Sequence, residues 1–400
     1  MKEVLSFTKV DMDNWNDSET NEYVKSITHL NKILNLLLEH TVNESEKIYR
    51  PLHGRELTSD ERLFGFIKFW TEVKYNFAFF DQVPELDWDK VLIDFIPRVQ
   101  INQDNTSYYK LLSEICALLN DGHTNIYPPS DLSKRTANLP LELKEFEDGI
   151  FLTNFGINSN SELEIGMKLI SIDDIAVNDL VEKEMSFISA STDYIKRRNA
   201  IAQILEGIKG TDAELQFQNL KDSIININLK RTNNIDWHRK KPYNGLTYFT
   251  KKDNIGILEI NSFGNSKVVE RFESHLSELV SIDNLVIDLR NNGGGNSGYG
   301  YQILDYFSSQ AIITSKWKTK EHKPAYMAWG KSITGNIEAL TEWESEALRT
   351  YQGDYWYESP PDTIESTNDN LKDLNTVILI GNNTASAAED FLIAAESLLL

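Results

Sequence analysis

The sequence predicts three units in succession: a helical unit, a β unit of short strands, and an α/β unit. Three observations predict this order. Apolar residues recur at helical spacing over residues 58–119. From residue 139 to 230 the apolar runs are short and bounded by turn residues, as in strands. From residue 248 strand-like and helix-like runs alternate, which is typical of a largely parallel sheet. We expect the units to span residues 1–138, 139–235 and 245–400.

The composition is that of a folded protein with an acidic surface. Of 400 residues 40% are hydrophobic and 25% charged, and the net charge is −21. Such a charge disfavours nucleic acids and anionic membranes, whose phosphates it repels. Cys116 is the single cysteine and falls in an apolar helical pattern, which predicts a buried structural thiol and no internal disulfide. No run approaches the roughly 20 apolar residues of a membrane span, and no signal-peptide core opens the chain.

The helical unit is predicted from periodicity and from start and stop signals. Thr58 and Glu61 form a capping-box pattern, Pro97 is expected to stop one helix, and Gly122 is expected to end another in a left-handed conformation. Four helices are predicted. One begins at Thr58, and the other three cover residues 22–40, 89–96 and 108–119.

The β unit contains a segment with the character of a peptide-binding domain. Residues 164–174 read as a turn that feeds a strand and ends in a tight acidic turn, and Gly210 leads into a late strand. This pattern resembles a PDZ domain, which binds an extended peptide along an exposed sheet edge. The alternative is a generic small β domain with no ligand. The predicted strands are residues 150–153, 168–172, 213–218 and 224–229, with one helix at 193–206.

The α/β unit places two special turns at the carboxyl ends of strands, where ligands of such sheets bind. One turn is the triple glycine 293–295, and the other precedes a helix that begins at Ser386. Residues 315–371 show little periodicity and receive no predicted element. The chain stops inside an apolar helical pattern, so we expect the natural protein to continue. The predicted strands are residues 255–260, 285–289, 311–314 and 376–380, and the predicted helices are 267–280, 299–307 and the one at Ser386.

A serine at a helix start beside a glycine turn is the arrangement that acyl transfer needs. Ser386 would be the nucleophile, small Ala385 and Ala387 would let a substrate approach it, and the N–H group of Ala387 would bind the developing oxyanion. The plainer alternatives are that Ser386 merely caps a helix and that the glycines form a tight loop. However, three successive glycines cost backbone entropy that an ordinary turn need not lose.

Three motifs together resemble a known family. Residues 288–295 (DLRNNGGG) and 383–389 (NTASAAE) look like the tail-specific, or C-terminal processing, protease and tricorn-core family of serine peptidases (family S41), and residues 121–124 (DGHT) match a third motif. The resemblance runs from about Thr58 to the end. It implies a crotonase-like fold for the α/β unit, which would then be C-terminally incomplete. It also implies Gly294 as the second oxyanion donor, Glu389 as a supporting residue, and an extracytoplasmic location.

The resemblance leaves two candidates for the catalytic base. One branch of the family uses a lysine well after the serine, but residues 387–400 contain no Lys, Arg or His, so such a lysine would lie beyond Leu400. The tricorn branch uses a histidine before the PDZ-like unit, which here is His123. A neutral imidazole suits a general base, although the tricorn motif has a serine where this chain has Gly122. The plainer interpretation of His123 is a surface-turn histidine.

These predictions together favour a serine endopeptidase that acts on unfolded or C-terminally recognised polypeptides. Its partner would be a peptide or protein substrate, and no metal or cofactor motif is found. The alternative is a non-catalytic binding protein on the same scaffold, in which the aromatic residues of 315–371 line an apolar site.

Overall fold

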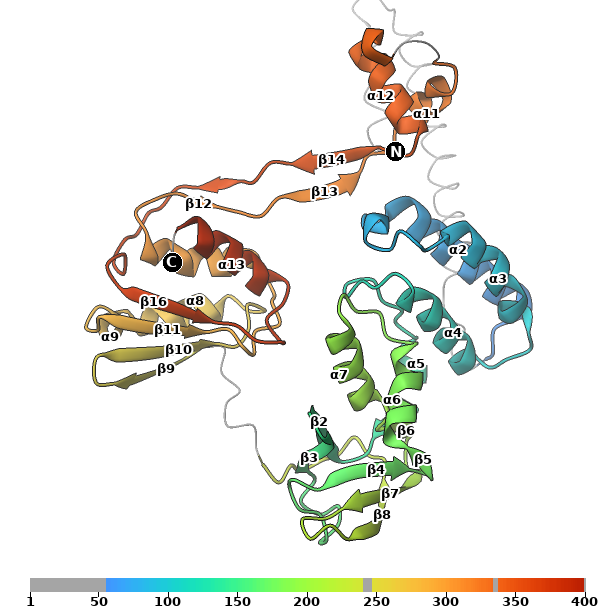
Figure 1. Ribbon diagram of the computed structural model, residues 1–400, viewed down its shortest axis with the longest axis vertical. Helices are drawn as coiled ribbons and strands as arrows, with labels where there is room; N and C mark the ends of the chain where they lie inside the picture. The colour runs from blue at the N-terminus through green and yellow to red at the C-terminus, as the bar shows by residue number, and fades with distance from the viewer. Residues whose placement is uncertain (1–54, 240–246, 334–336, 399–400) are drawn as a thin grey trace, which may run out of the picture. The chain divides into compact units, whose positions relative to one another are not determined.

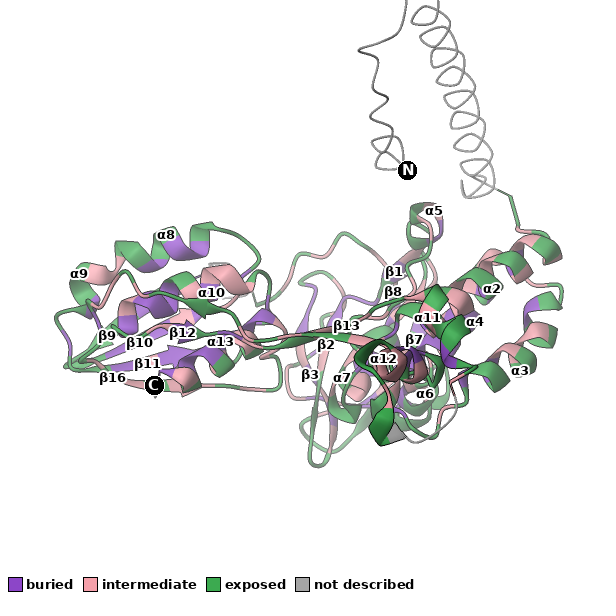
Figure 2. Ribbon diagram, turned by 90° about the horizontal axis from the view of Figure 1, so that it is seen from above, coloured by how far each residue is buried: buried purple, intermediate pink, exposed green. Residues whose placement is uncertain are grey.

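The computed structural model describes residues 55–239, 247–333 and 337–398. The predicted helix at 22–40 therefore lies outside the described residues. Three separate apolar clusters form the core, one in each of the helical, middle and C-terminal segments (Figure 2). The domain boundaries given above stay a prediction.

The helical segment contains α2 (Ser59–Asn76), α3 (Trp88–Gln100), α4 (Asn105–Ala117) and a short 3-10 helix, η2 (Phe80–Gln82). The capping box at the start of α2 is confirmed: the N–H of Thr58 donates to Glu61 Oε2 at 2.8 Å, and the N–H of Glu61 donates to Thr58 Oγ1 at 3.2 Å. Buried Phe66, Val91 and Ile115 come from the three long helices and pack into one cluster. This cluster is the reason the three amphipathic helices stay together.

Two predicted helix ends were wrong. Pro97 lies inside α3, which continues to Gln100. The buried guanidinium of Arg62 donates to the carbonyl groups of Val99 and Ile101, at 3.2 and 3.0 Å, so a tertiary contact satisfies carbonyl groups at the end of α3 that have no partner within the helix. After α4 the left-handed residue is Asn120, with φ of +50°, and not Gly122. Asparagine adopts this conformation more readily than most residues.

The middle segment is a sheet with strand order β2-β3-β4-β7-β8, and β5 pairs with β4. The four predicted strands are present, and α7 is shorter than the predicted helix. The elements that were not predicted are α5, β1, β2, β5, α6 and β6. β2 lies at the edge of the sheet, and several of its residues are exposed. The alternation of apolar and polar residues that would reveal a strand is therefore weak in its sequence. The elements are α5 (Ser130–Ser133), β1 (Thr136–Asn138), β2 (Leu141–Phe146), β3 (Gly149–Phe155), β4 (Lys168–Ile172), β5 (Ile175–Ala176), α6 (Val177–Met185), α7 (Asp193–Gln203), β6 (Glu206–Ile208), β7 (Asp212–Gln218) and β8 (Ile224–Lys230).

The C-terminal segment is built on a four-stranded sheet of order β16-β11-β10-β9. β11 is parallel to both β10 and β16, as predicted, and β9 is antiparallel to β10. Buried residues of β10 and β11 pack against the helices in one cluster that includes Leu258, Ile287 and Phe391. The elements are β9 (Thr247–Lys252), β10 (Ile255–Ile260), α8 (Lys267–Ser274), α9 (Leu276–Leu279), β11 (Asn284–Asp288), α10 (Ser297–Leu304), η3 (Asp305–Phe307), β16 (Asn375–Leu379) and α13 (Ala387–Ser397).

Residues 315–371 contain elements that periodicity did not reveal. An antiparallel pair of strands leads to two packed helices (Figure 1). Gly330 permits that helix packing, because a β-carbon there would lie 2.0 Å from the carbonyl oxygen of Ala347. The elements are β12 (Ile312–Ile313), β13 (Trp317–Lys320), α11 (Pro324–Gly330), η4 (Ile337–Ala339), α12 (Glu342–Tyr351), β14 (Trp356–Ser359) and β15 (Thr363–Ile364).

Candidate active site

Ser386 lies in a strained turn between β16 and α13. Its backbone has φ of +56° and ψ of −125°, a combination that L-residues rarely adopt. A serine that only caps a helix is normally extended. Strain of this kind costs about 1–3 kcal/mol and concentrates at functional sites. A sharp strand-to-helix turn that presents a serine is also the arrangement of a nucleophile elbow. The capping role alone does not account for this backbone.

Gly294 lies directly against Ser386. A β-carbon at Gly294 would lie 2.7 Å from Ser386 Cβ and 3.0 Å from the backbone nitrogen of Ala387, and the residue has φ of +100°. Both the close approach and the positive φ require glycine. The two special turns, about ninety residues apart in the sequence, therefore meet in space.

The other two glycines of the turn have different roles. A β-carbon at Gly295 would lie 2.2 Å from the carbonyl carbon of Phe263, so Gly295 lets the turn pack against the residues that follow β10. Gly293 has no atom within 4 Å of such a β-carbon. The triple glycine is thus explained by contacts at two of its three positions.

Asn292 accepts two hydrogen bonds, one that joins the two turns and one within the glycine turn. Its carbonyl oxygen accepts from the N–H of Ala385 at 3.1 Å, next to the candidate nucleophile. Its side-chain Oδ1 accepts from the N–H of Gly294 at 2.9 Å. Asn292 is fully buried. Sequence reasoning assigned it no role, although Asn-x-Gly is a known signal for this side-chain turn.

The two candidate oxyanion donors beside Ser386 differ in whether their N–H groups already have a hydrogen-bond partner. The N–H of Ala387 has no partner among the described residues, whereas the N–H of Gly294 is occupied by Asn292 Oδ1. Ala387 is the first residue of α13, so its free amide also lies at the positive end of the helix dipole. Ala387 therefore offers a free donor for an oxyanion, and Gly294 offers one that must be shared.

Glu389 secures the Ser386 turn from inside α13. Its Oε2 accepts from the N–H of Ser386 at 2.7 Å, and its own N–H donates to the Ser386 carbonyl oxygen at 2.7 Å. Both bonds fix the backbone that carries the hydroxyl group. The position is consistent with the predicted supporting role and with a carboxylate at a helix N-terminus.

The strand that leads to the glycine turn ends in an ion pair. The guanidinium of Arg290 donates to both carboxylate oxygens of Asp288, at 2.9 Å to Oδ1 and 2.5 Å to Oδ2. These side-chain hydrogen bonds lower the pKa of buried Asp288. The pair braces the turn and does not contact Ser386.

His123 lies in an exposed turn held by its neighbours. The N–H of Gly122 donates to Ser191 Oγ at 3.2 Å, and Ser189 Oγ donates to the carbonyl oxygen of Asp121 at 2.7 Å. In the described part of the chain, no hydrogen bond links His123 to Ser386. The structure thus brings Ser386, Ala387, Gly294 and Glu389 together and leaves His123 as a prediction.

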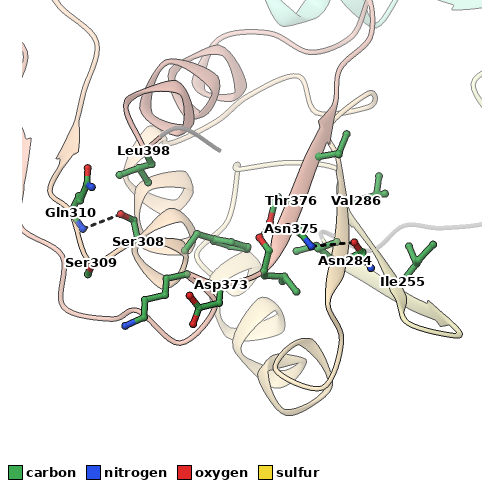
Figure 3. Close-up of a pocket in the computed structure, with 15 residues that line it drawn as sticks. Ile255, Asn284, Val286, Ser308, Ser309, Gln310, Asp373, Asn375, Thr376 and Leu398 are labelled. Atoms are coloured by element: carbon green, nitrogen blue, oxygen red, sulfur yellow. Dashed lines mark hydrogen bonds between the residues drawn. The ribbon is translucent and has the colours of Figure 1, made fainter.

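A cavity of about 820 Å³ lies at the opposite end of the sheet (Figure 3). Asn284 and Asn375, which contact each other there, are the first residues of β11 and β16, whereas the glycine and serine turns follow the last residues of these strands. This cavity is therefore not the site that Ser386 would serve. Within the described residues, no cluster of three or more His, Cys, Asp or Glu is suited to a metal, and no helix is long and apolar enough to cross a membrane.

A second cavity, of about 750 Å³, lies between the edge strand β2 and helix α7. Its walls are formed by all the residues of the strand and by one face of the helix, and they are both apolar and charged. The apolar residues that line it include Leu139, Leu141, Leu143, Tyr194, Ile201 and Leu205.

The comparisons with known proteins agree with this geometry. Residues 254–398, which include both turns, match the model of Peptidase family S41. These residues belong to Peptidase family S41. The predicted resemblance to this family is thereby confirmed over the segment that holds the motifs at 288–295 and 383–389, while the motif at 121–124 lies outside the matched residues. No curated protein matches the chain in sequence.

Solved structures show the fold that goes with this family. Mature CPAF complexed with lactacystin shares 13% identity with the chain, over 85% of this chain and 83% of that one, with a TM-score of 0.61. Mature CPAF alone shares 12% identity, over 85% and 82%, with a TM-score of 0.60. The photosystem II D1 C-terminal processing protease shares 14% identity, over 84% and 78%, with a TM-score of 0.40. The two CPAF structures, with TM-scores of 0.61 and 0.60, share the fold of this chain, a mixed α/β protein with N-terminal helices and several sheets.

Proposed function

We propose that this S41 protein is a serine endopeptidase with Ser386 as its nucleophile. The observation that carries the proposal is the strained serine turn packed against Gly294. Ser386 Oγ attacks the scissile carbonyl carbon, and a base takes the hydroxyl proton. The oxyanion is stabilised by the N–H groups of Ala387 and Gly294. The leaving amine takes up the proton as the C–N bond breaks, and water then hydrolyses the acyl-enzyme.

His123 is the base that we propose to test. Neutral imidazole is suited to this role near pH 7. The turn that carries His123 is anchored at Gly122 and Asp121 by serine hydroxyl groups, so its backbone is held while the ring stays exposed. A PDZ-like role for the β domain and a crotonase-like α/β fold belong to the same proposal.

The groove between β2 and α7 supports a peptide substrate. β2 lies at the end of its sheet, so an extended segment can add to it as a further strand. Capture of a free carboxylate needs unoccupied N–H groups, but the N–H of Leu139 donates to Leu205 and that of Leu141 donates to Leu139. Pro140 between them has no N–H. These contacts favour internal segments of unfolded polypeptides over recognition of a C-terminus.

The alternative of a non-catalytic binding protein has no comparable support. Three of the tryptophans within residues 315–371, the segment expected to line an apolar site, are largely exposed: Trp317 by 53%, Trp329 by 54% and Trp343 by 49%. Rings that face solvent to this degree do not enclose a ligand. The strained serine turn would also serve no purpose in a simple binder.

The proposal is tested by cleavage of an unstructured protein such as reduced, alkylated casein. We expect Ser386→Ala to abolish cleavage and His123→Ala to lower it by about 100-fold or more, because a general base contributes about 100 to 10,000-fold. His238, which stacks on Phe155, supplies a control substitution, His238→Ala, with unchanged cleavage expected. Undiminished cleavage by Ser386→Ala would rule out the mechanism. Undiminished cleavage by His123→Ala would rule out His123 alone.

A further inference from the structure

The side chain of Asn292 has no part in the reaction proposed above. Its Oδ1 accepts from the N–H of Gly294 at 2.9 Å, and its Nδ2 is buried with no hydrogen-bond partner among the described residues. The orientation of the amide is fixed, since the reverse would place two donors face to face. An unpaired buried donor costs about 1–3 kcal/mol, and such a cost in a native protein calls for an explanation.

Asn292 does not contact a substrate directly. Its side chain is fully buried, so Nδ2 is out of reach of a bound peptide. The route by which it acts is Gly294, whose N–H it holds beside Ser386. Asn292 also accepts from the N–H of Ala385, so a single residue sets the backbone on both sides of the candidate oxyanion hole.

We propose that Asn292 is a positioning residue that orients the Gly294 amide and releases it to the oxyanion during acyl transfer. This inference rests on the proposed function. In the resting protein the amide donates to a neutral carbonyl oxygen. A negatively charged oxyanion is a stronger acceptor, since hydrogen bonds to ionised groups are roughly twice as strong as neutral ones. The N–H is therefore shared with the oxyanion, or given up to it, when charge develops.

The proposal explains why the acceptor is an amide and not a carboxylate. An aspartate at this position would form the same turn. Its charge would hold the Gly294 N–H as strongly as the oxyanion does, and it would repel the oxyanion. The substitution Asn292→Asp therefore keeps the shape of the turn in the resting protein but lowers the stabilisation of the oxyanion in the transition state.

Asn296 supplies a matched control. Its Oδ1 accepts from the N–H of Gly298 at 2.9 Å, which is the same Asn-x-Gly turn in the same loop. Asn296 is exposed and caps α10, where aspartate is equally well suited. Asn296→Asp adds the same charge by the same substitution, and we expect it to leave turnover unchanged.

The experiment measures kcat and KM for a quenched fluorescent peptide, together with the inhibition constant of a peptide boronate, which forms a tetrahedral adduct with the serine. For Asn292→Asp we expect a kcat lower by about 100 to 1,000-fold, the loss typical of one oxyanion donor. KM should stay within about twofold, and the boronate should bind more weakly in proportion to kcat. Asn292→Ser, which keeps a neutral acceptor, should lose less activity than Asn292→Asp.

The remaining outcomes separate a failure of the Asn292 inference from a failure of the proposed function. An active wild type with full turnover in Asn292→Asp overturns the inference and leaves the proposed function standing. A lower kcat with unchanged boronate affinity also overturns it, because a merely structural defect would then be the cause. If Asn292→Asp does not fold, full turnover in Asn292→Ala overturns it. An inactive wild type that the boronate does not bind overturns the proposed function and the inference with it.

Discussion

The contact between Gly294 and Ser386 gives the sharpest mutational prediction. In Gly294→Ala the new methyl group would lie 2.7 Å from Ser386 Cβ, 2.8 Å from the carbonyl oxygen of Ala385 and 3.0 Å from the nitrogen of Ala387. Separations below 3 Å force neighbours to move, and two of these three separations are below 3 Å. All three neighbouring atoms belong to the turn that carries Ser386. The φ of +100° adds backbone strain of about 1–3 kcal/mol for any residue with a β-carbon.

The expected result is a loss of catalysis that exceeds the loss of stability. Movement of Ser386 and of the Gly294 amide together should lower kcat by at least the roughly 100 to 1,000-fold of one lost oxyanion donor. The free energy of unfolding should fall by a few kcal/mol, of the order of the strain. The assays are peptide turnover, normalised to folded protein, and urea unfolding followed by circular dichroism.

Gly293→Ala is the matched control, one residue away. No atom lies within 4 Å of the added methyl group, and Gly293 is not among the glycines with positive φ. We expect turnover and stability close to those of the wild type. Gly294→Ala with turnover equal to that of Gly293→Ala would refute the inferred contact between the two turns.

Three further predictions concern strain, burial and charge. Ser386→Gly should raise the free energy of unfolding by about 1 kcal/mol while it abolishes cleavage, because glycine adopts a φ of +56° without strain; a urea titration in which it is less stable than Ser386→Ala would contradict this. Burial raises the pKa of the Cys116 thiol to about 11, so a maleimide at pH 7 should react with it slowly in the folded protein and rapidly in urea; equal rates would refute the burial. Since Arg290 lowers the pKa of Asp288, this pair stabilises the fold above pH 4, the ordinary range of the carboxyl group, and the contribution disappears as pH falls through the lowered pKa. Asp288→Asn should therefore be less stable than the wild type at pH 7 by about 1.5–3 kcal/mol, with the gap closing in acid; a pH-independent gap would count against it.

Much of the α/β segment could be predicted because its apolar runs in the sequence coincide with the strands of the folded sheet. The apolar run at residues 255–260 is the strand β10 without change, and β11 and β16 differ from their predicted ranges by one residue at each end. Each of these strands contains an apolar run in the sequence, which is easy to find, even though β16 contains no fully buried residue and β10 is exposed at alternate positions. The glycine turn and the serine that follows β16 stand out for the same reason, since each interrupts a regular pattern at a strand end.

Other features depend on contacts that no local pattern shows. The helix α3 continues past Pro97 to a C-terminus whose carbonyl groups accept hydrogen bonds from Arg62, a residue more than thirty positions earlier in the chain. The predicted helix at 267–280 breaks at His275 into α8 and α9, although its apolar spacing is regular. The positive φ of Ser386 is likewise invisible in the sequence, as the residue is not a glycine.

The measurement that tests the central claim most directly is a crystal structure of the protein after reaction with a fluorophosphonate. The account predicts a covalent bond from phosphorus to Ser386 Oγ and a phosphoryl oxygen about 3 Å from the nitrogen atoms of Ala387 and Gly294. The Gly294 amide should have turned from Asn292 to that oxygen or be shared with it. An unmodified Ser386, or an adduct whose phosphoryl oxygen points away from both amides, would contradict the account.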